Sequence, residues 1–368
     1  MVYCVQYMHN AVSIVGCPSY GVDDVSLSIG ASLHPIGGIG AVVKPGMRTI
    51  VIPDLTGTHS RVVRAVVEAV EGAGGAPVIG YSPDGGAGTL RRLLAKTGIQ
   101  DVIDECGCES VCLDDDTEMI PAPGALTFRR LMVAREVLDA DAVICLPTLK
   151  STCLNGYSGA VSFLCHYMPR AARIAYRRHV CSDPALYADL LLDVHATVPP
   201  SLSIMEGIAG IRGPDGPGFI MASTSSTVLD YTAAAAVGLD PLSVPTIGRA
   251  YGRGEGPGSL SEIRVFGTPP PGFSPGDGVV HPAGREKGPS LAVRLADRTL
   301  AARPLIDAER CTGCGVCADL CPTGAIRMKA SALPRIRVAE CIRCLRCQER
   351  CPADAVVVGL PLLARLFR

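Results

Sequence analysis

The residues best suited to chemistry are cysteines, and eight of the chain's 17 fall in two similar runs near its C-terminal end. Each run reads Cys-x2-Cys-x2-Cys-x3-Cys-Pro, and the first begins at Cys311 and the second at Cys341. Three thiolates on one tight loop can bind three irons of a 4Fe–4S cluster, and the fourth cysteine of such a run ligates another cluster. The spacing therefore predicts two 4Fe–4S clusters.

The two predicted ligand sets exchange one cysteine between the runs. The first cluster would be held by Cys311, Cys314, Cys317 and Cys351, and the second by Cys341, Cys344, Cys347 and Cys321. Paired Cys-x2-Cys is also zinc spacing. Zinc, however, needs neither the third cysteine of each run nor the trailing Cys-Pro, so we favour iron–sulfur clusters. This segment resembles the bacterial two-cluster ferredoxins.

Composition limits the classes of partner. With 368 residues, of which 48% are hydrophobic, the chain is long enough for two or three domains with a real core. A net charge of −1, the lack of a basic run and the absence of tryptophan argue against nucleic acid and anionic membranes as partners. We find no apolar run of about 18 residues and no leader, and therefore expect no transmembrane segment and a reducing, cytoplasmic location.

The pattern of apolar residues before the cysteine runs predicts alternating strands and helices. Strands are predicted at 48–53, 77–80, 141–147, 201–205 and 261–266, and helices at 62–70, 88–103, 184–194 and 227–237. Such alternation predicts an α/β body with a mainly parallel, doubly wound sheet, followed by a C-terminal α+β ferredoxin-like domain.

Prolines and glycines concentrated in 268–289 indicate a domain boundary. We expect an α/β body over 1–267, a linker and connection over 268–300, the two-cluster ferredoxin domain over 301–358 and an amphipathic tail over 359–368. The tail would dock on the protein's own surface or, alternatively, contact a membrane or a partner.

Several short segments spread over most of the body resemble the prokaryotic family of unknown function DUF362. They lie at 12–20, 37–38, 43–46, 140–147 with Lys150, 208–213, 216–217, 221–223 and 238–241. The resemblance implies this same architecture, and many members carry a C-terminal ferredoxin, but the family has no single assigned reaction. Two motifs depart from its pattern, because Ile52-Pro53-Asp54 stands where Lys-Pro-Asn is usual and Lys150-Ser151-Thr152 where Lys-Thr-His is frequent. No role tied to that first lysine or that histidine is therefore carried over to this chain.

Polar side chains follow three of the predicted strands, where ligands of open α/β sheets bind. We predict Lys150, Cys153, His59 and Glu206 as catalytic residues and Thr58, Asn155 and Arg212 as cofactor-binding residues, with Asp54 nearby. Simpler roles compete with these. Thr58 or Ser60 would cap a helix, Lys150 would reach solvent and Cys153 would be a small buried residue.

Other cysteines and histidines suggest further metals only weakly. Two groups were considered, namely Cys165, His166, His179, Cys181 and His195 for one ion, and Cys106, Cys108 and Cys112 for a third cluster. The glycine-rich stretches match no nucleotide-binding motif. Nicotinamide and ATP are therefore unsupported, and a flavin is neither excluded nor supported.

These features predict an iron–sulfur oxidoreductase. As a reductase it would pass low-potential electrons from an external donor, such as a ferredoxin or flavodoxin, through two 4Fe–4S clusters. The acceptor would be a small-molecule substrate, anionic if Lys150 contacts it, or a cofactor in the body. The alternative is an accessory protein that carries electrons to a separate redox enzyme, and a weaker one is a metal-handling maturation factor.

Overall fold

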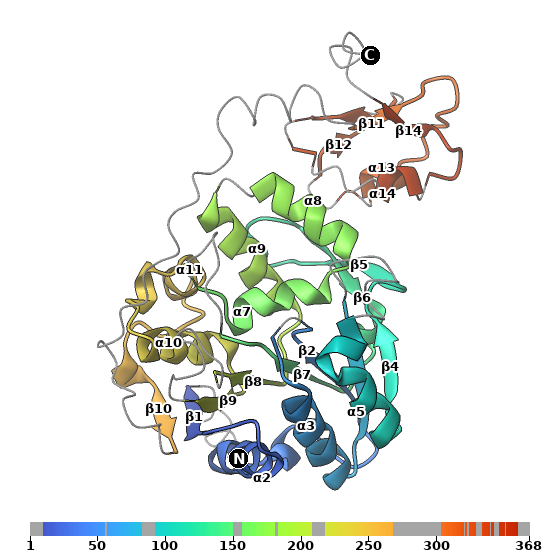
Figure 1. The fold of residues 1–368 in the computed structure, drawn as a ribbon. Helices are drawn as coiled ribbons and strands as arrows, with labels where there is room; N and C mark the ends of the chain where they lie inside the picture. Colours follow the sequence, from blue (N-terminus) through green and yellow to red (C-terminus); the bar gives the residue numbers. More distant parts are fainter. Residues whose placement is uncertain are drawn as a thin grey trace.

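The computed structural model describes two parts of the chain, an α/β body and a small C-terminal module (Figure 1). The described residues are 10–55, 57–82, 93–149, 157–180, 183–207, 218–267, 303–319, 321, 324–328, 333–338, 340–341, 346–349 and 351–359. The linker predicted at 268–300 and all but the first residue of the predicted tail lie outside them. The domain boundaries stay predictions.

An eight-stranded sheet forms the centre of the body, in the order β10-β1-β9-β8-β7-β2-β3-β4. Seven of these strands share one direction, and β9 runs antiparallel to both of its neighbours. The strands are β1 (Ala11–Gly16), β2 (Arg48–Pro53), β3 (Ala76–Tyr81), β4 (Glu109–Cys112), β7 (Ala142–Leu146), β8 (Leu202–Glu206), β9 (Phe219–Ser223) and β10 (Arg264–Phe266).

Helices cover both faces of this sheet (Figure 1). One face carries α2 (Val22–Leu33), α3 (Ser60–Gly72) and α5 (Ile99–Cys106), with η1 (His34–Ile36) and η2 (Ile39–Ala41) after α2. The other carries α7 (Ala160–Phe163), η3 (Leu164–Tyr167), α8 (Arg170–Val180), α9 (Pro184–Thr197), α10 (Ser226–Ala236), η4 (Pro241–Ser243) and α11 (Pro245–Gly252). The hairpin β5 (Thr117–Pro121) and β6 (Arg130–Ala134) and the turn α6 (Arg135–Leu138) extend this second layer.

Alternate residues of the central strands supply the two cores. On β2, Ile50 and Ile52 pack into the cluster under α9, whereas Val51 packs into the cluster under α3. The valines predicted to line α3 are fully buried, and burying each one contributes about 1.5–3 kcal/mol relative to exposure. The mainly parallel, doubly wound α/β fold predicted from the sequence is confirmed.

The order of the strands reverses between β2 and β7. From β2 the chain adds β3 and then β4 on one side, whereas β7 and β8 follow on the other side. Loops that leave the carboxyl ends of two such strands diverge, and this opening is the usual ligand site of open α/β sheets. The loop after β2 carries Thr58 and His59, and the loop after β7 begins just before Lys150.

Two details of the predicted elements are corrected by the structure. The helix predicted at 88–103 is interrupted at Gly98, whose φ of 71° is left-handed, so that α5 begins at Ile99. The strand predicted at 261–266 is shorter, because the turn η5 (Leu260–Glu262) precedes β10. The predicted start of α9 is confirmed, since the Asp183 side chain accepts hydrogen bonds from the Ala185 and Leu186 N–H groups.

The C-terminal module contains two small antiparallel pairs and two short helices. Strand β11 (Arg303–Ile306) pairs with β14 (Val356–Gly359), and β12 (Ile326–Arg327) pairs with β13 (Arg335–Ile336). The helices α13 (Val316–Asp319) and α14 (Arg346–Glu349) pack against each other. This small α+β arrangement agrees with the ferredoxin-like domain predicted for the segment.

Asp230 on α10 is a fully buried carboxylate that caps the start of α7. It accepts hydrogen bonds from the N–H groups of Ala160 (2.6 Å) and Val161 (3.0 Å) and from the Tyr157 hydroxyl (3.0 Å). Burial outweighs these three bonds and raises the pKa of Asp230 to about 6 from its ordinary value of 3.8. The cap fixes the chain directly after residues 150–156, which hold three of the predicted site residues.

Replacing Asp230 by asparagine should remove one pH-dependent part of the stability. A carboxyl whose pKa is higher in the folded state stabilises the protein most at low pH, and this contribution is lost as the pH rises through 6. Relative to Asp230→Asn, wild-type protein should therefore gain on the order of 1 kcal/mol between pH 7.5 and pH 5. Anaerobic unfolding of both proteins across this range measures the gain, and a constant difference would contradict the shifted pKa.

Candidate functional site

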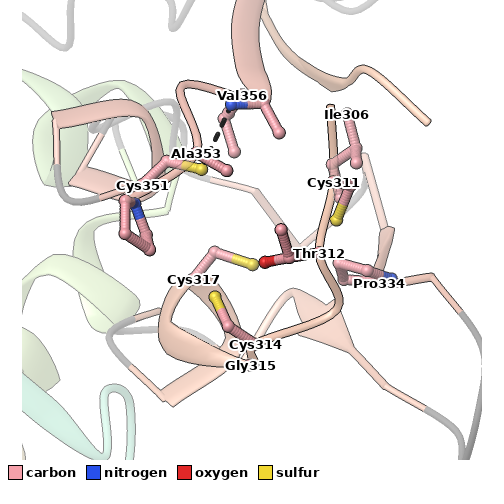
Figure 2. A pocket seen from close by; sticks show the side chains of 12 residues that line it. Ile306, Cys311, Thr312, Cys314, Gly315, Cys317, Pro334, Cys351, Ala353 and Val356 are labelled. Carbon is pink, nitrogen blue, oxygen red and sulfur yellow. Dashed lines mark hydrogen bonds between the residues drawn. The ribbon is translucent and has the colours of Figure 1, made fainter. Parts of the chain in front are cut away.

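Four cysteine side chains from distant parts of the sequence line one cavity in the C-terminal module (Figure 2). Cys311 and Cys314 lie on the loop that leads into α13, Cys317 lies on α13, and Cys351 ends the second run, before β14. These are the four cysteines predicted to hold the first cluster. The structure therefore brings together one complete predicted ligand set.

The chemistry of this cavity fits a 4Fe–4S cluster. All four cysteines are free thiols, and Figure 2 shows Cys351 and Cys311 on opposite sides of the cavity with Cys314 and Cys317 between them. A 4Fe–4S cube needs four such thiolates, one for each iron. The Ala355 N–H donates to the Cys351 Sγ over 3.2 Å. Burial and then the nearby Cys311 and Cys314 raise the pKa of Cys317, so an anionic set of thiols needs a positive group among them.

The second predicted ligand set is only partly described. Cys347 on α14 is buried in the core of the module, and Cys321 packs against the same core. Cys341 is half-buried at the start of its run, and Cys344 lies outside the described residues. Three of the four cysteines of the second set are therefore placed in the module, and their joint binding of a cluster stays a prediction.

The two halves of the module share a backbone turn after each Cys-Pro pair. Gly324 has a φ of 63° and donates its N–H to the Cys321 carbonyl, and Asp354 has a φ of 47° and donates to the Cys351 carbonyl. Left-handed backbone favours glycine and is tolerated by aspartate. The same local fold therefore places the fourth cysteine of each run.

Replacing Cys321 by serine should damage the cluster held by the second run and spare the one beside it in sequence. Its thiol is absent from the cavity lined by Cys311, Cys314, Cys317 and Cys351. Reconstituted Cys321→Ser should lose about half of its iron, and electron paramagnetic resonance should retain the signal of one cluster. The matched variant Cys351→Ser should spare the other cluster. Loss of the same signal in both variants would contradict the exchange of ligands.

The side-chain hydroxyl of Thr58, in the loop after β2, forms hydrogen bonds with the backbone. Its hydroxyl donates to the Leu146 carbonyl over 2.7 Å and accepts from the Asp54 N–H over 2.9 Å, and so joins the ends of β2 and β7. The helix cap predicted for Thr58 belongs to the next residue instead, because the His59 Nδ1 accepts the Arg61 N–H over 3.2 Å. A cofactor-binding role for Thr58 stays a prediction.

His59 and Glu206, both predicted as catalytic, meet at the carboxyl edge of the sheet. The His59 backbone N–H donates to the Glu206 Oε1 over 3.1 Å, and its ring stacks on Tyr20 with centroids 4.1 Å apart. Burial and then the nearby Arg61 lower the pKa of His59, so its imidazole is neutral at pH 7. Because Nδ1 accepts a hydrogen bond, the ring proton lies on Nε2.

The remaining predicted residues lie outside the described part of the chain. These are Lys150, Cys153, Asn155 and Arg212. Their loops nevertheless begin at the same edge, since Leu149 donates its N–H to the Glu206 carbonyl and Gly207 donates to the Phe219 carbonyl. Their catalytic and binding roles stay predictions.

Glu206 should prove important for stability, because it is 1% exposed and its side chain accepts a hydrogen bond from the backbone N–H of His59, the N-cap of α3. Glu206→Ala should lower the free energy of unfolding by about 1–3 kcal/mol, since the His59 N–H then loses its acceptor. Glu206→Gln retains an acceptor oxygen and should lose less. Denaturant unfolding of the three proteins measures this order, and equal losses in both variants would argue against the bond.

Among the described residues, a polar contact that no sequence pattern predicts joins the module to the body. The guanidinium of Arg130, the first residue of β6, donates to the carbonyl oxygen of Asp319, the last residue of α13. Asp319 lies two residues after Cys317. The contact therefore links α13, which carries Cys317, to β6 of the body (Figure 1).

Within the described residues, no three His, Cys, Asp or Glu side chains gather closely enough to hold a single metal ion. No helix of the described ranges is long and apolar enough to cross a membrane.

Comparisons with known proteins give two family matches. The model of the family described as "Domain of unknown function (DUF362)" matches residues 42–235, and that of the "4Fe-4S dicluster domain" matches residues 303–352. A similar protein is the "Thylakoid-associated protein sll1697" of Synechocystis sp. (strain ATCC 27184 / PCC 6803 / Kazusa), which is 29% identical over 257 residues, or 65% of this chain and 78% of that protein.

Among solved structures, the lactate racemase apoprotein from Thermoanaerobacterium thermosaccharolyticum is similar at a TM-score of 0.40 and 13% identity. The match covers 54% of this chain and 51% of that one, so this chain spans about half of that protein's length.

Proposed function

This chain belongs to the DUF362 family, and we propose that it is an iron–sulfur reductase whose C-terminal module delivers electrons to a small molecule bound by the α/β body. Its 4Fe–4S ferredoxin-like domain supports electron transfer in general. The observation that carries the proposal is the cavity lined by Cys311, Cys314, Cys317 and Cys351, in a module whose helix α13 contacts the body.

The residues of the module would hold two clusters. The four thiols of the first cavity would bind one, and Cys321, Cys341, Cys344 and Cys347 the other. A 4Fe–4S cluster, when bound, accepts and donates single electrons at a potential set by its surroundings. Here the Ala355 N–H bonds the Cys351 Sγ, and apolar side chains such as Ile306 and Val356 line the cavity. Both features tune the potential through hydrogen bonding and solvent exclusion.

The body would receive the electrons where it touches the module. Arg130 bonds the end of α13. The next two residues of β6, Leu131 and Met132, are buried in the core that also contains residues of α8 and α9. Joining carrier and acceptor in one chain replaces a diffusional encounter with an intramolecular one. An external low-potential donor, such as a ferredoxin or flavodoxin in a reducing cytoplasm, would refill the module.

Anaerobic reconstitution tests the proposal. The chain should bind about eight iron and eight sulfide ions, as two 4Fe–4S clusters require. After reduction with dithionite it should be reoxidised by a member of a panel of small organic acids. Stoichiometric zinc without sulfide would refute the iron–sulfur assignment. Reoxidation only by a larger redox protein would favour the accessory role over the reductase.

Two neighbouring arginines provide a matched test of the contact between the parts. Arg130→Gln removes the donor to α13, whereas Arg129→Gln changes an exposed arginine beside it. Both variants should keep the iron content of the wild type. Arg130→Gln alone should increase hydrogen exchange in 130–134 and 316–319 and slow reoxidation by the small molecule. Equal behaviour of the two variants would show that this contact does not position the module.

A further inference from the structure

A cavity of about 420 Å³ lies in the body between η3, α8 and α9, in the layer that covers the second face of the sheet. Its size is that of a site for a small molecule. It is separate from the Thr58–Glu206 region and from the cysteine cavity of the module. Its polar and aromatic lining residues are Cys165, His166, Arg170, Arg173, Tyr176 and Tyr187.

The described lining of this cavity includes two arginines. Arg170 and Arg173 both line it from α8, and none of its described lining residues is acidic. Asp114 is not a lining residue, but its carboxylate bonds the start of α8, since its Oδ1 accepts the Arg170 backbone N–H over 3.1 Å and the Ser82 hydroxyl over 2.7 Å. Arginine guanidinium groups bind carboxylates and phosphates with particular strength.

His166 adds a third polar group to the same wall. Its Nδ1 lies 2.9 Å from the Phe163 carbonyl, which can only accept, so Nδ1 carries a proton and Nε2 is the nitrogen available to a ligand. Burial alone would lower the pKa of His166, but Cys165, whose Sγ lies 3.7 Å from Nδ1, outweighs it and raises the pKa. No three donors of the metal site suggested by the sequence gather among the described residues, which exclude Cys181; that suggestion named Cys165, His166, His179, Cys181 and His195.

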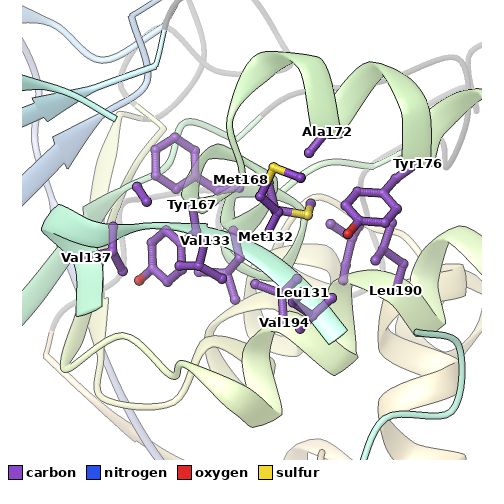
Figure 3. Close-up of a cluster of buried hydrophobic side chains, with 14 of the residues drawn as sticks. Leu131, Met132, Val133, Val137, Tyr167, Met168, Ala172, Tyr176, Leu190 and Val194 are labelled. Atoms are coloured by element: carbon purple, nitrogen blue, oxygen red, sulfur yellow. The ribbon is translucent and has the colours of Figure 1, made fainter. Parts of the chain in front are cut away.

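The floor of the cavity is apolar. Met168, Tyr176 and Leu190 line it and also belong to the core cluster that contains Leu131 and Met132 of β6 (Figure 3). A ligand with an apolar or aromatic body would replace water on these surfaces.

The cavity also lies where electrons would arrive. Asp114, which follows β4, accepts hydrogen bonds from the Ser82 hydroxyl, which follows β3, and from the Arg170 N–H at the start of α8. Arg170 therefore lies over the carboxyl edge of the sheet. Arg130, which holds the module, directly precedes the buried residues of β6 that share a core with the cavity floor.

We propose that this cavity binds a small organic oxyanion, with its carboxylate or phosphate on Arg170 and Arg173 and its apolar body over Met168, Tyr176 and Leu190. His166 lies beside the anion and donates to it from Nε2 when its imidazole is protonated, since Nδ1 is bonded to the Phe163 carbonyl. That this ligand is the electron acceptor rests on the proposed function, whereas the binding itself does not.

Titration calorimetry on the oxidised, cluster-loaded protein tests the site with three probes, trans-cinnamate, phenyl phosphate and the neutral trans-cinnamamide. At least one anion should bind about tenfold more tightly than the amide, because charge-assisted hydrogen bonds are stronger than neutral ones. Preference for cinnamate would assign a carboxylate site, and preference for phenyl phosphate a phosphate site. Equal affinity for the amide, or no binding of any probe, would overturn the proposal.

Variants locate the binding. Arg173→Gln and, at the exposed mouth, Arg170→Gln should each weaken the anion about tenfold and leave the amide unchanged. Arg135→Gln is the matched control, since Arg135 pairs with Asp116 and Glu118 away from the cavity and should leave the affinity unchanged. An equal effect of all three substitutions would indicate nonspecific attraction and overturn the site.

A fluorescent reporter gives an independent readout. The chain contains no tryptophan, so Ile174→Trp places a single one on the cavity wall, at a position 40% exposed. Its emission should change on binding of the anion with the affinity measured by calorimetry, and no change would place the ligand elsewhere.

The binding tests use oxidised protein and are therefore independent of the reoxidation assay, which uses reduced protein. If an anion binds but does not reoxidise the reduced clusters, the reductase is refuted and the binding site is not. Reoxidation by an anion that Arg173→Gln does not affect would refute the site alone.

Discussion

Burial of both faces of the parallel sheet is the constraint on which the remaining structure depends. A parallel sheet with apolar residues on each face must be covered twice, so the chain returns after most strands through a helix on one side or the other. The carboxyl ends of β2, β3, β4, β7 and β8 consequently meet at one edge. The polar loops gather there because the two faces have no room for them.

The backbone at that edge has to be satisfied where the strands diverge. The Thr58 hydroxyl bonds the backbone between the ends of β2 and β7, and the Glu206 carboxylate bonds the backbone between the loop after β2 and β8. Polar residues at a switch point can therefore serve the fold as well as a ligand. Conversely, a candidate ligand site need not be built from strand ends. The arginines of the cavity beneath α8 come from a helix of the covering layer.

Local patterns made much of the fold predictable from the sequence. The β-branched run of β2 was predicted with its observed bounds, and five valines at helical spacing identified the buried face of α3. Strand β9 was not predicted, and a local pattern could not have predicted its antiparallel direction, because direction depends on the pairing partners. The break at Gly98 was missed because a single glycine is often tolerated within a helix.

The sites, too, were predictable where they depend on local spacing and not where they depend on tertiary packing. Cysteine spacing is a local property, and it led to four cysteines that do share a cavity. By contrast, Arg173 and Tyr187 belong to different helices, so their meeting follows from tertiary packing and leaves no motif in the sequence. The capping role of His59 was likewise hidden, because histidine is not among the preferred capping residues.

The contact between Arg130 and the module has an evolutionary consequence. The acceptor is the main-chain carbonyl of residue 319, which every amino acid supplies, so the interaction does not depend on the Asp319 side chain. Residue 319 can therefore drift during divergence while the docking persists, provided that the helix still ends there. Selection at this junction should act on one partner only, and related sequences need not show correlated changes at positions 130 and 319.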